Sequence, residues 1–268
     1  MTTLQTDIGR NKLWEKPRKD EVLRTYARNF RQPGFPPSEL PTEDDLPYDD
    51  GEPMETPQHH EQMDILIYSL RAYWKKSRKY YIGGNMFLHF DLDRKKKFRG
   101  PDFFLVTDAD DRQRKSWVVW QEGMKYPDLI IELLSDTTRK TDRGEKKELY
   151  QQVFGTSEYY IYDPFSCEFE GYRLSGGRYK TVKPDKERKI YSPVTGLWLI
   201  VRDELLRWMT EDGYILPTYE ELSEKERQRA EQEKLRAEQA EKYLITEKLR
   251  AERLAAKLRE LGISPEAV

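Results

Sequence analysis

The feature that most constrains the fold is a short apolar run, residues 129–134, interrupted by a single acid, Glu132. A near-continuous apolar run of this kind is typical of a strand that is buried on both faces of a sheet. A carboxylate inside such a strand is costly unless it is paired or bound to a metal ion. Glu132 is therefore the first candidate for a functional residue.

The elements around this strand predict an α/β fold. An apolar stripe at helical spacing covers residues 58–74, and a second helix is expected at 143–154, closed by Gly155. Further strands are expected at 80–82, 86–91, 103–106, 117–121 and 159–162, followed by a hairpin around 175–178 and an apolar segment at 196–201. This order of elements predicts a sheet with helices packed on it.

The composition divides the chain into three parts. Residues 1–44 form an N-terminal arm that is rich in prolines and acids from residue 33, and residues 45–210 form the globular domain. Residues 219–261 contain no Gly or Pro and predict one long helix.

An apolar seam with a seven-residue repeat follows this helix. It consists of Ala230, Ala237, Leu244, Ala251 and Leu258, with Ala240, Leu254 and Leu261 three residues on. The seam favours a coiled coil, and hence a homodimer through residues 219–261, through the globular domain, or through both. The alternative is a single solvated helix held by charge pairs four residues apart.

Charge is segregated along the chain, although the net charge is only -2. Residues 37–64 hold ten acids and no Lys or Arg, whereas residues 71–99 hold ten Lys and Arg. The second segment ends in a basic run that could bind the phosphates of DNA or could be a solvated turn between strands. The run comprises Arg94, Lys95, Lys96, Lys97 and Arg99.

The remaining composition bears on the compartment. No apolar run approaches the roughly 20 residues of a membrane span, and no apolar stretch at the N-terminus precedes a cleavage site. The single cysteine, Cys167, cannot form an internal disulfide, which agrees with a reducing compartment. We therefore expect a soluble, cytoplasmic protein without a membrane partner.

Two Pro-Asp pairs compete to supply a second acid beside Glu132. Asp128 lies four residues away on the same strand, about 13 Å along it, so the two carboxylates cannot readily share one ion. Asp102 starts a neighbouring strand and can lie beside Glu132 at roughly 5 Å. Strand geometry therefore favours Asp102 with Glu132.

A helical lysine can complete this group. Lys146 shares the core-facing side of the helix 143–154 with Leu149 and Tyr150, whereas Lys147 points elsewhere. Beside a buried glutamate, Lys146 is either a structural ion pair or part of an active site. Asp142 is interpreted as the cap of this helix or as a supporting residue of the site.

The spacing of these residues follows a known pattern. It consists of Pro101-Asp102, Pro-Asp-Leu-Ile-Ile-Glu-Leu-Leu-Ser at 127–135, Asp142 and Lys146 as Asp-x-x-x-Lys, then Tyr150, and the segment 155–163. This pattern resembles the Uma2 family of restriction-type endonucleases, part of the PD-(D/E)XK nuclease superfamily, over roughly residues 45–205. The segment 50–55 and His59 are similar to the entry segment of the family.

The resemblance implies a restriction-endonuclease-like mixed sheet flanked by helices, with a site for Mg²⁺ or Mn²⁺. Asp102 and Glu132 would bind the ion, with the backbone carbonyl of Leu133 as a further ligand. The chain departs from the superfamily pattern at Leu134, where the usual motif has its lysine. Either Lys146 has taken over that role from the helix, or the site is impaired. His59 is either a supporting residue or a structural one.

Three hypotheses follow from the sequence. The first is a metal-dependent endonuclease that cleaves DNA with Asp102, Glu132 and Lys146. The second is a degenerate nuclease fold that binds nucleic acid, or a partner through its coiled coil, without turnover. The third is a structural coiled-coil protein in which Glu132 and Lys146 form only an ion pair.

Overall fold

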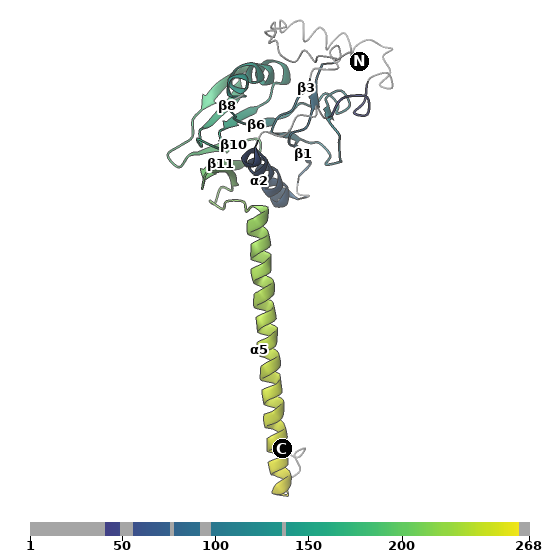
Figure 1. Cartoon of the computed structure of the whole chain (residues 1–268), viewed down its shortest axis with the longest axis vertical. Coiled ribbons are helices and arrows are strands. Elements are labelled where there is room, and N and C mark those ends of the chain that lie inside the picture. The colour runs from purple at the N-terminus through teal and green to yellow at the C-terminus, as the bar shows by residue number, and fades with distance from the viewer. Residues whose placement is uncertain (1–40, 49–55, 76–77, 92–97, 136–137, 263–268) are drawn as a thin grey trace, which may run out of the picture. The chain divides into compact units, whose positions relative to one another are not determined.

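The computed structural model describes residues 41–48, 56–75, 78–91, 98–135 and 138–262. These residues belong to two compact units, Met1–Leu216 and Pro217–Val268. The first unit contains the sheets and the second contains the long helix α5 (Figure 1). The prediction that an arm ends at residue 44 stays a prediction, because residues 1–40 and 49–55 lie outside the described part of the chain.

A six-stranded mixed sheet forms the centre of the first unit. Its strand order is β1-β4-β6-β7-β8-β9, in which β6 and β7 are parallel and all other neighbours are antiparallel. The strands are β1 (Tyr80–Gly83), β4 (Phe103–Thr107), β6 (Leu129–Leu133), β7 (Glu158–Tyr162), β8 (Phe169–Ser175) and β9 (Arg178–Val182).

The first face of this sheet is covered by α2 (Pro57–Trp74) and by a small antiparallel sheet. That sheet consists of β10 (Lys189–Ser192), β11 (Leu197–Arg202) and β12 (Leu205–Met209). Leu66 and Leu70 of α2 pack in one core with Leu105, Ile131 and residues of the small sheet. Figure 1 shows α2 in front of the strands, in the region labelled β10 and β11.

The second face carries the helix that links β6 to β7, together with another small sheet. That sheet is formed by β3 (Phe98–Arg99), β2 (Leu88–His89) and β5 (Trp117–Val118). The helix covers residues 139–154 and consists of α3 (Arg139–Thr141), the π-helical turn η2 (Asp142–Lys146), α4 (Lys147–Leu149) and a second π-helical turn, η3 (Tyr150–Phe154). Gly155, with φ 65°, closes it in the left-handed conformation that glycine adopts readily.

The strand β6 is buried along its whole length, as the apolar run predicts. Its side chains alternate between the two cores: Leu129, Ile131 and Leu133 join the first-face core, and Ile130 joins the second-face core. The α/β architecture expected from the sequence, a mixed sheet flanked by helices, is confirmed. The strands expected at 86–91 and 117–121 are shorter, because β2 and β5 pair over two residues each.

The helix α5 (Tyr219–Glu260) is 42 residues long, about 63 Å. A capping box begins it, because Thr218 accepts from the N–H of Glu221 and the Glu221 side chain accepts from the N–H of Thr218. None of its residues is buried. The long C-terminal helix is thus present as expected, whereas its pairing in a coiled coil stays a prediction. No helix in the described ranges is long and apolar enough to cross a membrane.

Candidate active site

Glu132 lies in the middle of β6 with its side chain on the second face. Its neighbours at strand spacing, Ile130 and Leu134, belong to the second-face core. The Glu132 side chain is fully buried. Two donors reach its carboxylate: the Tyr150 hydroxyl donates to Oε1 at 2.7 Å, and the Lys146 ammonium donates to Oε2 at 3.1 Å. One hydroxyl and one cation therefore offset the cost of burying this charge.

Asp102 lies directly before β4 on the same face. Phe103 pairs with Ile131 in the antiparallel register of β4 and β6, and extending this register by one residue sets Asp102 opposite Glu132. Opposite side chains of an antiparallel pair share a face, with Cβ atoms about 5 Å apart. Asp102 Oδ2 also accepts from the backbone N–H of Leu133 at 2.7 Å. The half-buried Asp102 is thereby fixed to the strand that carries Glu132.

Lys146 reaches the carboxylates from the helix. Its ammonium lies 3.1 Å from Glu132 Oε2 and 2.7 Å from Asp142 Oδ1. The pair with Asp142 spans four residues, the spacing at which helical side chains are neighbours. The Lys146 side chain is 16% exposed, so solvent reaches this edge of an otherwise buried group.

Asp142 does not cap the helix, which corrects that interpretation of the sequence. The helix begins at Arg139 after Thr138, and the Asp142 N–H donates to the Thr138 carbonyl at 2.9 Å as an interior helical residue does. The Asp142 side chain is fully buried and paired with Lys146. The spacing of Asp142 and Glu145 imitates a capping box, which is why the sequence suggested a start four residues too late.

The electrostatics of the group are those of crowded buried acids. Burial raises the pKa of Glu132 to about 7, with Lys146 opposing the shift and Asp102 adding to it. Burial and the charge of Glu132 raise the pKa of Asp142 to about 6, again against Lys146. Burial also raises the pKa of Asp102, although Lys146, the Leu133 N–H and a hydrogen bond with Glu132 lower it. Three carboxyl groups thus face one ammonium, and their negative charge is only partly compensated.

Burial lowers the pKa of Lys146, but the negative charges of Glu132, Asp142 and Asp102 raise it by more. The pKa of Lys146 therefore lies above its ordinary value. Lys146 therefore stays protonated at neutral pH. It can donate hydrogen bonds or offset negative charge, but it cannot act as a base.

The family model of Uma2, described as "Putative restriction endonuclease", matches residues 35–202. This match covers more than half of the chain. The chain belongs to the Uma2 family. The description of the family suggests a restriction-type nuclease.

Five chains of known structure are similar to this Uma2 chain. One is the crystal structure of "a putative nuclease belonging to DUF820" from Anabaena variabilis. It is 16% identical, with a TM-score of 0.41, and the alignment covers 58% of this chain and 90% of that one. A comparison with curated proteins found no match.

Asp128, the competing acid, has a different environment in this Uma2 chain. Its Oδ2 accepts from the N–H of Thr107 at 2.7 Å and from the Thr107 hydroxyl at 2.6 Å. Asp128 therefore ties the start of β6 to the end of β4.

His59 lies at the other end of β6. It is buried, with Nε2 3.1 Å from the Leu134 carbonyl oxygen and Nδ1 2.8 Å from the Thr56 hydroxyl. These contacts fix the start of α2 against the end of β6. They attach His59 to the end of the strand that carries Glu132.

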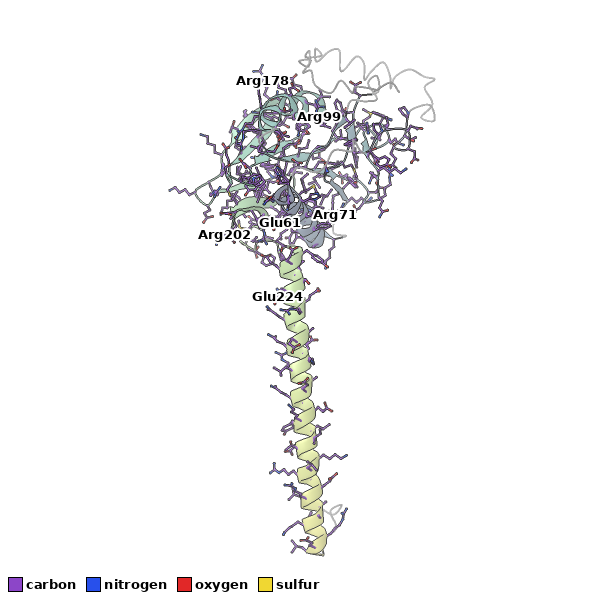
Figure 2. All side chains as sticks on the ribbon, viewed as in Figure 1. Glu61, Arg71, Arg99, Arg178, Arg202 and Glu224 are labelled. Carbon is purple, nitrogen blue, oxygen red and sulfur yellow. The ribbon has the colours of Figure 1, made fainter. Side chains whose placement is uncertain are left out.

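The basic run is only partly within the described structure. Arg94, Lys95, Lys96 and Lys97 lie outside the described residues. Arg99 is on β3 and is labelled in Figure 2.

Tyr150 belongs to the sequence pattern, but its contact with Glu132 was not predicted. It is fully buried, and its hydroxyl holds one oxygen of Glu132. The sequence contains a signal for this contact, because Tyr150 follows Lys146 by four residues on the core-facing side of the helix. A donor at that position reaches the same carboxylate. The neighbouring Tyr159 donates to the Asp142 carbonyl at 2.9 Å and secures the same turn of helix.

The donor set of Asp102 and Glu132 fits a hard divalent cation. Two carboxyl groups face each other across paired strands, and both have raised pKa values, which a cation between them would reverse. Leu133 directs its N–H toward Asp102, so its carbonyl leaves the strand along the same edge. Within the described ranges, no group of three or more His, Cys, Asp and Glu side chains is arranged to hold a metal ion.

Proposed function

We propose that this chain is a metal-dependent endonuclease that hydrolyses phosphodiester bonds in DNA. The observation that carries the proposal is the placement of the Lys146 ammonium, 3.1 Å from the buried carboxylate of Glu132, which lies opposite Asp102. Acid pair and lysine come from different elements, and they meet where solvent reaches the ammonium. Membership in the Uma2 family supports the reaction class.

The residues divide the chemistry as follows. Asp102 and Glu132, with the Leu133 carbonyl, would hold Mg²⁺ or Mn²⁺, which supplies Lewis-acid activation of water and of the phosphoryl oxygens. Lys146 remains protonated and donates toward the attacking water or the developing negative charge. Water adds to phosphorus and releases its proton to solvent, while the bond to the leaving oxygen of the DNA strand breaks and that oxygen takes up a proton.

Two further residues hold this arrangement in position. Asp142 forms an ion pair with Lys146, and this pair holds the ammonium beside Glu132. Tyr150 occupies one oxygen of Glu132 and fixes the orientation of the carboxylate. A group supported in this way is preorganised rather than assembled by the substrate.

The test is cleavage of supercoiled plasmid DNA in Mg²⁺ and in Mn²⁺. We expect Glu132→Ala and Lys146→Ala to abolish cleavage. Lys147→Ala is the matched control, because the Lys147 ammonium lies over the Tyr172 ring at 3.6 Å and not at the acids. Cleavage that persists in both Glu132→Ala and Lys146→Ala would reject the proposal.

A second candidate function rests on Leu134, which stands where the superfamily pattern has lysine. In a degenerate nuclease, Lys146, Glu132 and Asp142 form a closed ion-pair group, and the protein binds DNA without cleaving it. Salt-sensitive DNA binding without turnover in either metal is the outcome that selects this candidate.

We also propose that α5 pairs with α5 of a second copy. The helix has no buried residue, and seven large apolar side chains within it are more than half exposed. They are Tyr219, Leu235, Tyr243, Leu244, Ile245, Leu249 and Leu254, and Leu261 just beyond the helix is exposed as well. Light scattering of the full chain measures the mass, and we expect a dimer that Leu244→Glu with Leu254→Glu converts to a monomer.

A further inference from the structure

Arg99 lies on the face of the small sheet that packs on the second-face core. Arg99 pairs with Leu88 in the antiparallel register of β3 and β2, so their side chains share a face. Leu88 is buried in the same core as Tyr150. The neighbouring Phe98 faces the other way, where its ring stacks on Phe87 at 3.9 Å.

Tyr150 links this core to the acids, because its hydroxyl donates to Glu132 at 2.7 Å. Arg99 shares a face of the small sheet with Leu88, and Leu88 and Tyr150 belong to one core. Arg99 therefore lies on the side of the small sheet that packs toward Tyr150.

Arg99 has donor capacity that its surroundings do not use. Its Nη1 donates to the Phe98 carbonyl at 3.0 Å, and its Nε is buried without a hydrogen-bond partner among the described residues. No ion pair within the described ranges involves Arg99. By contrast, Arg139 and Arg143 on the nearby helix are paired with carboxylates. A guanidinium with several unused donors is suited to bidentate contact with a phosphate.

The acid site needs such a cation if it is to accept DNA. If a divalent cation is bound and all three carboxyl groups are ionised, their three negative charges are balanced by that cation and the Lys146 ammonium, with no positive charge left over. A phosphodiester that enters adds one further negative charge, and Arg99 is a cation on this face that can compensate for it. We propose that Arg99 binds a phosphate of the DNA strand beside Glu132. This inference rests on the proposed function, and it assigns Arg99 as a residue that binds the DNA substrate.

DNA binding in EDTA, where no cleavage occurs, tests this role. Fluorescence anisotropy with duplex and single-stranded oligonucleotides of one sequence gives the affinity across a range of salt concentrations. We expect Arg99→Gln to weaken binding about tenfold at low salt and to reduce the slope of log affinity against log salt by about one, as loss of one phosphate contact does.

Arg202→Gln is the matched control. Arg202 is an exposed arginine at the end of β11, in the small sheet on the first face, and its loss changes the net charge by the same amount. Figure 2 labels both arginines. A wild-type slope in Arg99→Gln, or an equal loss in Arg202→Gln, overturns the inference.

Arg99→Lys covers the case in which Arg99→Gln does not fold. The lysine keeps the charge but cannot form the bidentate contact, so we expect a wild-type salt slope with several-fold lower affinity. Unchanged affinity at unchanged thermal stability overturns the inference. Because binding is measured without turnover, a protein that never cleaves DNA leaves this result intact, while Lys146→Ala separately decides the proposed function.

Discussion

Two buried acids close to the same helix have opposite electrostatic environments. Glu132 is surrounded by other acids, and burial with the charge of Asp102 raises its pKa to about 7. Asp163, directly after β7, is equally buried. Burial would raise its pKa too, but hydrogen bonds from Ser166, Arg139 and the backbone lower it to about 2.

The difference lies in what each carboxylate accepts. Asp163 receives the N–H groups of Phe165 and Ser166, the Ser166 hydroxyl at 2.6 Å and the Arg139 guanidinium at 2.5 Å. Glu132 receives one hydroxyl and one ammonium that it shares with Asp142. Asp163, whose oxygens are fully hydrogen-bonded, stabilises the fold. Glu132, whose negative charge is only partly compensated, lowers the stability of the folded protein, and a functional role would explain why it is present.

The largest expected effect separates activity from stability at Glu132. Glu132→Gln removes the charge while keeping the shape, so we expect DNA cleavage to fall by at least about a thousandfold, as for loss of a principal electrostatic group. Because repulsion with Asp102 and Asp142 disappears, the free energy of unfolding should be unchanged or higher. Plasmid cleavage and urea titration measure the two quantities, and a large loss of both would remove the contrast with Asp163.

Because the pKa of Glu132 is raised in the folded protein, the stability of the protein should fall as the pH rises. The folded protein holds a proton on Glu132 up to about pH 7, whereas the unfolded chain releases it near pH 4.5, so this stabilisation is present below pH 4.5 and lost as pH rises through 7. We expect a decline of roughly 3 kcal/mol in metal-free buffer from this group. Glu132→Gln should flatten the curve between pH 4.5 and 7, and a curve as steep as that of the wild type would contradict the assignment.

Asp163 should behave in the opposite way. Its folded pKa of about 2 lies below the ordinary 3.8, so its stabilisation is present above pH 3.8 and lost as pH falls through 2. We expect Asp163→Asn to lower the free energy of unfolding at pH 7 by about 2 kcal/mol. Cleavage per folded molecule should stay at the wild-type level, and a variant that is stable but inactive would move Asp163 into the site.

Tyr150→Phe tests the hydrogen bond that orients Glu132, and its effect should be the smallest. Removing the hydroxyl deletes one donor to a buried charge, so we expect a loss of about 1.5 kcal/mol in the free energy of unfolding. Calorimetric titration with Mn²⁺ should show several-fold weaker binding, since the carboxylate is no longer held in one orientation. The same stability loss with unchanged Mn²⁺ affinity would make Tyr150 purely structural.

Much of this arrangement could be predicted from the sequence, because it follows from periodicity. The apolar run at 129–134 predicts a buried strand, and the helical phase of Lys146 against Lys147 predicts which lysine meets the acids. The roles of these residues in catalysis stay predictions. The start of the helix could not be read, because the Asp142–Glu145 spacing imitates a cap, and only tertiary packing shows that Asp142 is an interior residue.

Other parts carry no strong local signal. The strands β2, β3 and β5 pair over two residues each, too few for an alternating pattern to develop. The orientation of Arg99 depends on that short register, so a count of basic residues cannot distinguish it from its neighbours. Asp163 likewise resembles any turn aspartate until Arg139, 24 residues earlier, is seen to reach it.

Glu132 has a further consequence for how the sheet assembles. The strand β6 is apolar toward both faces, so hydrophobicity alone barely distinguishes its correct alignment with β4 and β7 from one shifted by a single residue. Such a shift would turn Glu132 into the first-face core, among Leu105, Ile131 and Tyr160, and away from Lys146 and Tyr150. The one charged side chain in the strand thus makes misaligned pairings energetically unfavourable during folding. Replacing it with an apolar residue would remove this penalty.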